Sequence, residues 1–259
     1  MQMKRGIYKM ERILSKKNDR VKKWKKLHTK KGRELTGVYL IEGFHLIAEA
    51  MEHNAPIQEF LVSEQVKETL FEKYPQEKVV MISKEIADYL SDTESPQGVF
   101  AIVEKEMPDT PADFIKPYLL LDNVQDPGNV GTMIRTADAA GYGGVVLGKG
   151  TVDLYNSKVL RSTQGGHFHF PVYEGDLNEW FALFKSHHFP IYGTELNEDA
   201  ASYREINAPE IYGLVMGNEG NGMDKELLKQ TTKNLYIPIT GQAESLNVAV
   251  AAGILMFSL

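Results

Sequence analysis

The chain has 259 residues, of which 42% are hydrophobic, so it can bury a sizeable core as one large domain or two small ones. It contains no cysteine, which excludes disulfides, thiolate metal sites and cysteine nucleophiles. The net charge of -6 conceals an asymmetry, because residues 1–33 hold 14 Lys/Arg against two acids. No apolar run approaches the roughly 18 residues of a membrane helix and no export signal is recognisable, so we expect a cytoplasmic protein.

The basic segment carries apolar residues at helical spacing. They recur at steps of three, four and seven: Ile7, Met10, Ile13, Leu14, Val21, Trp24 and Leu27. This periodicity predicts amphipathic helical turns that dock on a body and leave the lysines exposed. A solvated helix face or a disordered tail is the alternative interpretation. A docked cationic face suits the phosphate backbone of a nucleic acid better than a disordered tail does.

Strand-like and helical runs alternate after the basic segment and predict a small α/β unit. The expected strands cover 37–43, 57–63, 79–83 and 97–104, and the expected helices cover 44–53, 64–74 and a stretch ending at residue 90. A proline-rich stretch without periodicity follows and is the best candidate for a linker. We therefore expect an amino-terminal domain over 1–104, a linker over 105–117 and a second domain over 118–259.

The second domain repeats the alternation. Its expected strands cover 118–122, 143–148, 168–173, 190–194, 211–216 and 234–238, and its expected helices cover 130–140, 153–163, 176–187, 223–230 and 246–258. Such alternation predicts an α/β fold with a mostly parallel sheet, covered on both faces, and ligands at the carboxyl ends of its strands. The last helix is apolar nearly all round and must be covered by the chain or by a second subunit. We therefore expect a homodimer.

Three polar loops follow strands of the second domain. In the first, Asn129 precedes a helix that contains Arg135; its glycine spacing is not G-x-G-x-x-G, and the next strand lacks the acid that a dinucleotide ribose would need. The second loop, "MGNEGNG", places Glu219 among glycines that permit tight turns. The third places Ser245 and Asn247 at the start of the last helix, where they could serve merely as caps.

These loops match a known family. "NVGTMIRTADAAG", "VMGNEGNGM" and "IPITGQAESLNVAVAAG" resemble, in order, the three motifs of the SpoU-type (TrmH-like) RNA ribose 2′-O-methyltransferases of the SPOUT superfamily. Residues 15–51 are similar to the amino-terminal RNA substrate-binding domain that many of these enzymes carry. The resemblance implies a carboxyl-terminal trefoil knot, although chains as a rule do not thread through loops. It also implies dimerisation through the knot domain and S-adenosyl-L-methionine as methyl donor.

The resemblance also implies the residues of the site. Catalytic roles would fall on Arg135, Asn129, Glu219, Ser245 and Asn247, and cofactor contacts on Gly217, Ile237, Leu246 and Thr194. The basic segment would contact RNA through Asn18, Arg20, Lys22, Lys23, Lys25, Lys26 and Arg33. No metal is expected, since methyl transfer needs none and His167 and His169 are expected to point to opposite faces of a strand.

Arg135 is the one cation among these proposed catalytic residues. A guanidinium is normally never neutral, so we expect it to stabilise the developing alkoxide or to bind a phosphate, although the family often assigns it the role of base. The alternative without a catalytic role is a surface ion pair between Arg135 and Asp138. Asn129 and Asn247 would orient Arg135 and the ribose, while Glu219 would fix Arg135 or a backbone amide.

The function we expect is methyl transfer to a ribose 2′-hydroxyl, which only RNA offers, so DNA is not a substrate. Ribosomal RNA of the large subunit (23S) is favoured over transfer RNA, with guanosine as the expected target. Two other classes stay open at this point. They are a non-catalytic RNA-binding or ribosome-assembly protein and a nucleotide-dependent enzyme of Rossmann type.

Overall fold

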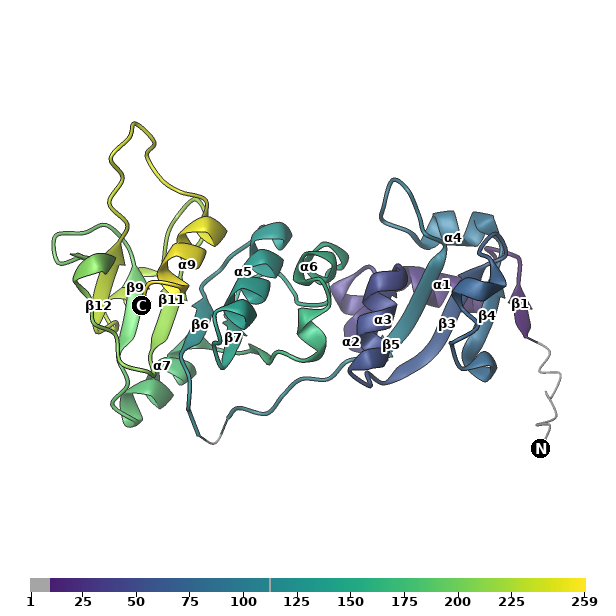
Figure 1. The fold of residues 1–259 in the computed structure, drawn as a ribbon, viewed down its shortest axis with the longest axis horizontal. Helices are drawn as coiled ribbons and strands as arrows, with labels where there is room; N and C mark the ends of the chain where they lie inside the picture. The colour runs from purple at the N-terminus through teal and green to yellow at the C-terminus, as the bar shows by residue number, and fades with distance from the viewer. Residues whose placement is uncertain (1–9, 112) are drawn as a thin grey trace. The chain divides into compact units, whose positions relative to one another are not determined.

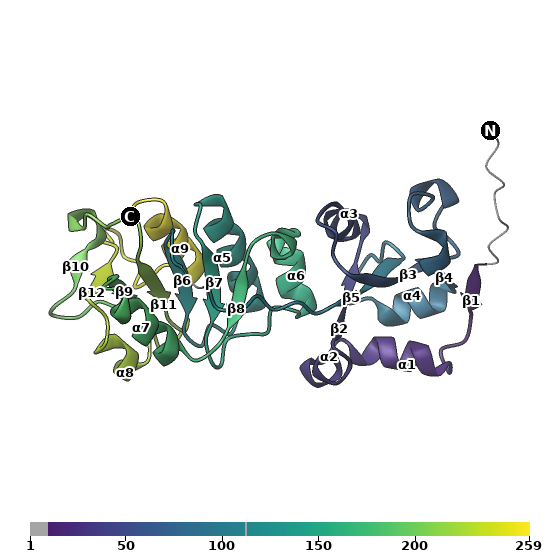
Figure 2. The same ribbon diagram turned by 90° about the horizontal axis from the view of Figure 1, so that it is seen from below.

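The computed structural model describes residues 10–111 and 113–259 (Figures 1 and 2). The chain forms two compact units, Met1–Glu106 and Met107–Leu259, which we call the amino-terminal and the carboxyl-terminal unit. Within the described residues, none of the helices has the length and apolar character needed to cross a bilayer.

The amino-terminal unit is built on a mixed sheet of five strands in the order β1-β4-β3-β5-β2. Its strands are β1 (Glu11–Ile13), β2 (Val38–Glu42), β3 (Ile57–Ser63), β4 (Val79–Ile82) and β5 (Val99–Glu104). Strands β1, β4 and β3 run parallel, whereas β5 is antiparallel to both β3 and β2. All four residues of β4 are buried, as expected for a strand covered on both faces.

Helices cover both faces of this sheet. They are α1 (Asp19–Lys26), α2 (Lys30–Thr36), α3 (Phe44–Glu52) and α4 (Lys84–Leu90), with short 3₁₀ turns at Glu68–Leu70 and Gln76–Lys78. Figure 2 shows α3 on one face and α1 and α4 together on the other. Val21 and Trp24 turn inward from α1 and join one core with Ile86 and Leu90 of α4. The docked helix that the apolar spacing predicts is therefore present over residues 19–26.

Two expectations for this unit are wrong. Residues 11–13 form a strand and not a helical turn, because they extend the sheet by pairing with β4. Residues 64–74 form turns and a short 3₁₀ segment in place of a helix. Their apolar residues Phe71 and Tyr74 are buried, and Tyr74 stacks on Phe60, so tertiary packing replaces helical hydrogen bonding here. Ile7, from the predicted periodicity, lies outside the described residues.

The carboxyl-terminal unit contains a seven-stranded sheet in the order β10-β12-β9-β11-β6-β7-β8, and every pairing in it is parallel. Its strands are β6 (Tyr118–Leu121), β7 (Gly144–Leu147), β8 (Val172–Glu174), β9 (Ile191–Thr194), β10 (Ala201–Ser202), β11 (Gly213–Met216) and β12 (Lys233–Tyr236). The predicted parallel α/β sheet is confirmed. Strand pairing does not decide whether the last segment is threaded through a loop, so the trefoil knot stays a prediction.

Helices lie on both faces of this sheet. They are α5 (Pro127–Ala139), α6 (Ser157–Thr163), α7 (Leu177–Ser186), α8 (Lys225–Leu228) and α9 (Val248–Met256), with 3₁₀ turns at Gly166–Phe168 and Tyr203–Glu205. Figure 2 shows α5 and α9 on one face and α7 and α8 on the other. Helix α6 crosses α5 at Gly131, where a Cβ atom would lie 2.4 Å from the Cβ of Ser162. Glycine at this position therefore lets the two helices approach closely.

The segment around His167 and His169 differs from the prediction. His167 lies in a 3₁₀ turn, His169 directly follows it, and the strand begins only at Val172. The His167 ring is within 3.2 Å of the Thr163 hydroxyl, and burial together with the nearby His169 lowers its pKa to about 3. His169 instead contacts Asp138 on α5. The two rings therefore do not occupy opposite faces of a strand.

Candidate active site

Hydrogen bonds between side chains join the three polar loops of the carboxyl-terminal unit. The Asn247 amide donates from Nδ2 to Oδ1 of Asn129 at 2.9 Å. Asn129 in turn donates from Nδ2 to Oε1 of Glu219 at 3.1 Å. Residues separated by up to 118 positions in the chain thus form one polar cluster, which we call the Asn129 cluster. The convergence of these loops in space is confirmed.

Glu219 anchors this cluster to the backbone. Its carboxylate accepts from the backbone N–H of Gln125 at 3.2 Å and of Asp126 at 3.1 Å, besides the Asn129 amide. Partial burial opposes ionisation of Glu219, but these hydrogen bonds outweigh it and lower the pKa of the carboxyl group. Glu219 is therefore a fixed anion that ties the loop after β11 to the loop after β6.

Helix α5 begins earlier than its sequence suggests. Asp126 is the N-cap and accepts from the Asn129 N–H at 2.9 Å, and Pro127 opens the helix, where its missing N–H costs nothing. Asn129 accordingly lies in the first turn of α5 and not in the preceding loop. The rigid first turn orients the Asn129 side chain toward Glu219 and Asn247.

Asn247 has two roles. Its Oδ1 caps α9 by accepting from the N–H of Ala249 at 2.9 Å and of Val250 at 3.2 Å, while its Nδ2 donates to Asn129. The sequence allowed either capping or a place in the site, and the structure combines the two. Ser245 does not cap the helix; it lines a neighbouring cavity.

Arg135 lies two turns along α5 from Asn129, about 9 Å farther along the helix axis. It is exposed, and among residues 10–111 and 113–259 it makes no hydrogen bond or ion pair. The two internal partners considered for it are engaged elsewhere. Asp138 binds His169 at 3.0 Å, and Glu219 binds Asn129 and backbone amides. The expectation that Glu219 fixes Arg135 is therefore wrong in this structure, whereas its alternative, a backbone amide, is confirmed.

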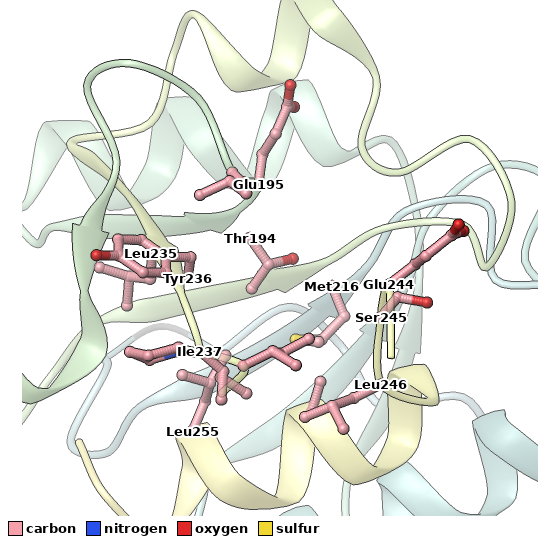
Figure 3. Close-up of a pocket in the computed structure, with 14 residues that line it drawn as sticks. Thr194, Glu195, Met216, Leu235, Tyr236, Ile237, Glu244, Ser245, Leu246 and Leu255 are labelled. Atoms are coloured by element: carbon pink, nitrogen blue, oxygen red, sulfur yellow. The ribbon is translucent and has the colours of Figure 1, made fainter. Parts of the chain in front are cut away.

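A cavity of about 490 Å³ lies between β12, α9 and the loop that joins them, and Figure 3 shows the residues that line it. Three predicted cofactor contacts line it: Thr194, Ile237 and Leu246. Ser245 and Leu246 of its wall come immediately before Asn247 in the chain. The cavity and the polar cluster are therefore adjacent.

The cavity wall suits an adenosyl group attached to a short charged chain. Apolar side chains of β12, α9 and the loop between them supply most of it, including Leu235, Ile237 and Leu255. Among the described residues, no partner is found for the backbone hydrogen-bonding groups of 238–246, so they are available to a ligand. The volume lies within the range of about 300–1,000 Å³ that is usual for small-molecule sites. Thr194 contributes its carbon atoms, because its hydroxyl already donates to the Val215 carbonyl.

Gly217 is not part of this wall. A Cβ atom on Gly217 would lie 2.4 Å from the backbone of Gly222 and Met223, so glycine is required for the loop to close on itself.

The neighbour of Gly217, Met216 at the end of β11, does line the cavity. Met216 and Leu255 were missed in the sequence because buried apolar residues of a strand and a helix look like ordinary core. Glu195 and Glu244 are the carboxylates of the wall.

The three residues other than lysine that are predicted to contact RNA all make structural contacts in the amino-terminal unit. Arg33 is 3% exposed and donates to the Leu27 carbonyl at 2.7 Å, which closes the turn between α1 and α2. Asn18 is the N-cap of α1. Arg20 bridges Glu11 and Glu59 and lies over the Trp24 ring. Arg33 is thus removed from the surface that a phosphate could reach.

The predicted lysines form the outer surface of α1. Lys22, Lys23 and Lys26 are exposed, and Lys25 is half-buried. Lys22 pairs with Asp19 one turn earlier, where both groups are solvated and the pair is weak. On α1, the basic surface that the sequence predicts is therefore carried mainly by lysines.

Comparison with known proteins covers nearly the whole chain. Residues 116–257 match the SpoU rRNA Methylase family, and residues 18–101 match the MRM3-like substrate binding domain. The chain is 47% identical over 255 residues to the 23S rRNA (guanosine(2553)-2'-O)-methyltransferase RlmP of Bacillus subtilis, covering 96% of this chain and 99% of that protein.

Two solved structures with bound AdoMet have the same fold. The rRNA methyltransferase of Sinorhizobium meliloti superposes with a TM-score of 0.85 at 30% identity and covers 96% of this chain and 97% of that one. The SpoU methyltransferase AviRb of Streptomyces viridochromogenes superposes with a TM-score of 0.82 at 25% identity, covering 93% and 96%. The likeness extends over both compact units.

Proposed function

This chain belongs to the SpoU rRNA methylase family and is an S-adenosylmethionine-dependent RNA methyltransferase, and we propose that it methylates the ribose 2′-hydroxyl of a guanosine in 23S rRNA. The guanosine that corresponds to position 2553 in the name of the Bacillus subtilis relative is the first candidate. The observation that supports this proposal most is that Ser245 and Leu246, which line a ligand-sized cavity, directly precede Asn247 of the Asn129 cluster, since the reaction must bring a methyl donor and a hydroxyl together.

We infer that the cavity beside α9 holds the cofactor, with Thr194, Ile237 and Leu246 as contacts and Gly217 as the residue that shapes the neighbouring loop. Bound there, S-adenosylmethionine supplies an electrophilic methyl group on a sulfonium. Methyl transfer is an in-line displacement, so the remaining task of the protein is to position the sugar oxygen and to stabilise its charge.

The Asn129 cluster performs the positioning in this proposal. Glu219 accepts a hydrogen bond from Asn129, and Asn129 accepts one from Asn247, so Asn129 is held from both sides. Ser245, two residues before Asn247, offers a hydroxyl in the cavity wall. Fixed amide dipoles need no reorganisation during the reaction, which is why such a cluster aids catalysis.

Arg135 supplies the positive charge. Because no acid in the described residues neutralises it, its guanidinium is available to the developing alkoxide or to a phosphate of the acceptor nucleotide. A group that stays protonated acts as an electrostatic stabiliser and not as a base.

The amino-terminal unit binds the RNA in this proposal, and a second copy of the chain covers α9. The exposed lysines of α1 support the first assignment. The second is supported by two apolar side chains of α9 and its end, since Val250 is 53% exposed and Phe257 is 66% exposed.

Methyl transfer to a transcript of the 23S rRNA segment around the candidate guanosine tests the function. We expect the labelled methyl group to enter one nucleotide, and none to enter a transcript whose acceptor carries 2′-deoxyribose. Transfer RNA serves as the competing substrate. Methylation of transfer RNA alone, or of the deoxy transcript, would contradict the proposal.

A further inference from the structure

We propose that Tyr89 of α4 is a stacking platform for an unpaired nucleobase of the RNA substrate, with Lys25 binding an adjoining phosphate. This inference adds a contact to the proposed function and rests on it, because it takes RNA to be the partner of the amino-terminal unit.

The side chain of Tyr89 is an aromatic group at the surface of a basic region. Tyr89 is 39% exposed although α4 is otherwise anchored by buried apolar residues, Ile86, Ala87 and Leu90. Two ammonium groups lie near its ring, with Nζ of Lys25 at 5.1 Å and Nζ of Lys16 at 5.4 Å from the ring centroid. An exposed aromatic ring with two cations close to it combines the two kinds of contact that single-stranded nucleic acids use.

The charges around the ring are unevenly neutralised. Lys16 is 3.0 Å from a Glu85 carboxylate oxygen, and Asp88 is paired with Lys84, so each acid of α4 already has a cation. Lys25 has no carboxylate partner among the described residues. A phosphate can therefore recruit Lys25 without breaking an ion pair, and this leaves the ring face to a base.

A lysine strip continues from Tyr89 across α1. At about 100° per residue, Lys25, Lys22 and Lys26 follow one another around the helix at steps of about 60° and 40°. Val21 and Trp24 form the buried face of α1. The three lysines therefore begin on the side of α1 that is next to α4 and continue around to its solvent-exposed side. A strand of RNA whose base stacks on Tyr89 could thus keep its phosphates on the same strip.

An unpaired base fits better than a duplex. The faces of paired bases are covered by their neighbours in the helix, whereas loops and bulges present free faces that stack on aromatic side chains. The predicted ligand is therefore a single-stranded or bulged segment, and the ring makes little contribution to binding of a continuous duplex.

Binding of labelled oligoadenylate to the full chain tests the inference, with the same strand annealed to oligouridylate as the paired probe. We expect Tyr89→Ala to weaken binding of the single strand by roughly 5- to 150-fold, the usual range for a base stacked on an aromatic residue, and to change duplex binding by less than about twofold. Tyr89→Phe keeps the ring and should bind as the unchanged chain does. Lys25→Gln should lower the slope of log affinity against log salt by about 0.7.

Leu35→Ala is the matched control, because Leu35 is 77% exposed in the same unit. Its loss should change the affinity neither for the single strand nor for the duplex. Thermal unfolding of each variant separates loss of contact from loss of fold. The stacking role would be overturned if Tyr89→Ala weakened binding of the single strand and of the duplex equally. It would also be overturned if Tyr89→Phe weakened single-strand binding as much as Tyr89→Ala does. Failure of the unchanged chain to methylate 23S rRNA would instead contradict the proposed function and leave the binding comparison intact.

Discussion

Arg135 in the carboxyl-terminal unit and Arg33 in the amino-terminal unit occupy opposite environments. Arg33 is buried and donates to the Leu27 carbonyl, whereas Arg135 is exposed and has no partner among the described residues. A guanidinium whose hydrogen bonds are made inside the protein stabilises the fold. One whose donors are unused on the surface can bind an anion. The comparison shows that partners, and not residue type, decide which arginine is available to an anion.

Arg135→Ala gives the largest expected effect, and tests one side of this contrast. We expect kcat to fall by about 10²–10³-fold, the range seen when one preorganised charge-stabilising donor is removed. The midpoint of thermal unfolding should not change, because no described contact is lost. Methylation kinetics and a thermal unfolding scan measure the two quantities. A variant with near-normal turnover would remove Arg135 from the mechanism.

Arg33→Ala tests the structural role of the buried arginine. We expect unfolding free energy to fall by about 2 kcal/mol, since a buried charged donor is lost and the Leu27 carbonyl is left without it. Methylation per folded molecule should be unchanged at low temperature. Urea denaturation measures the loss, with Lys31→Ala on the exposed face of α2 as the control. If Arg33→Ala instead lowered the affinity for RNA and left stability unchanged, Arg33 would be assigned to RNA binding.

Joint replacement of Lys22, Lys23 and Lys26 by glutamine has the smallest expected effect. These ammonium groups are exposed, so their removal should leave stability within about 0.5 kcal/mol. Each phosphate contact that they make contributes about 0.7 to the salt dependence of single-strand binding, so a slope reduced by up to about 2 is expected. Fluorescence anisotropy over a range of salt concentrations measures it. An unchanged slope would assign these lysines to solubility alone.

Much of the site could be predicted from sequence because its parts are local. Asn129, Glu219 and Asn247 each follow a short apolar strand, and in a parallel sheet the carboxyl ends of strands share one edge. Thr194, Ile237 and Leu246 were placed by resemblance to the family motifs, and the structure sets them around one cavity. Met216 and Leu255 could not be distinguished from core residues, since side-chain type does not show which apolar group borders a void.

The amino-terminal unit was harder to predict. Residues 11–13 carry the apolar spacing of a helix, yet pairing with β4 offered them more hydrogen bonds than a short isolated turn could make. The basic character of the segment was plain from composition, but which cations stay exposed was not. Arg20 became part of a network with Glu59, a residue 39 positions away.

The sequence by itself determined the parallel α/β sheet, the apolar face of α1 and the three polar loops, because strand alternation, helical spacing and motif order are local properties of the chain. Only the tertiary structure decided the partners of each polar group. Glu219 was taken by Asn129 and backbone amides and Asp138 by His169, which left Arg135 without an acceptor among the described residues. Arg33, by contrast, was taken by the Leu27 carbonyl. The physical reason is that a hydrogen bond depends on distances of about 3 Å between atoms far apart in sequence, and folding alone sets those distances.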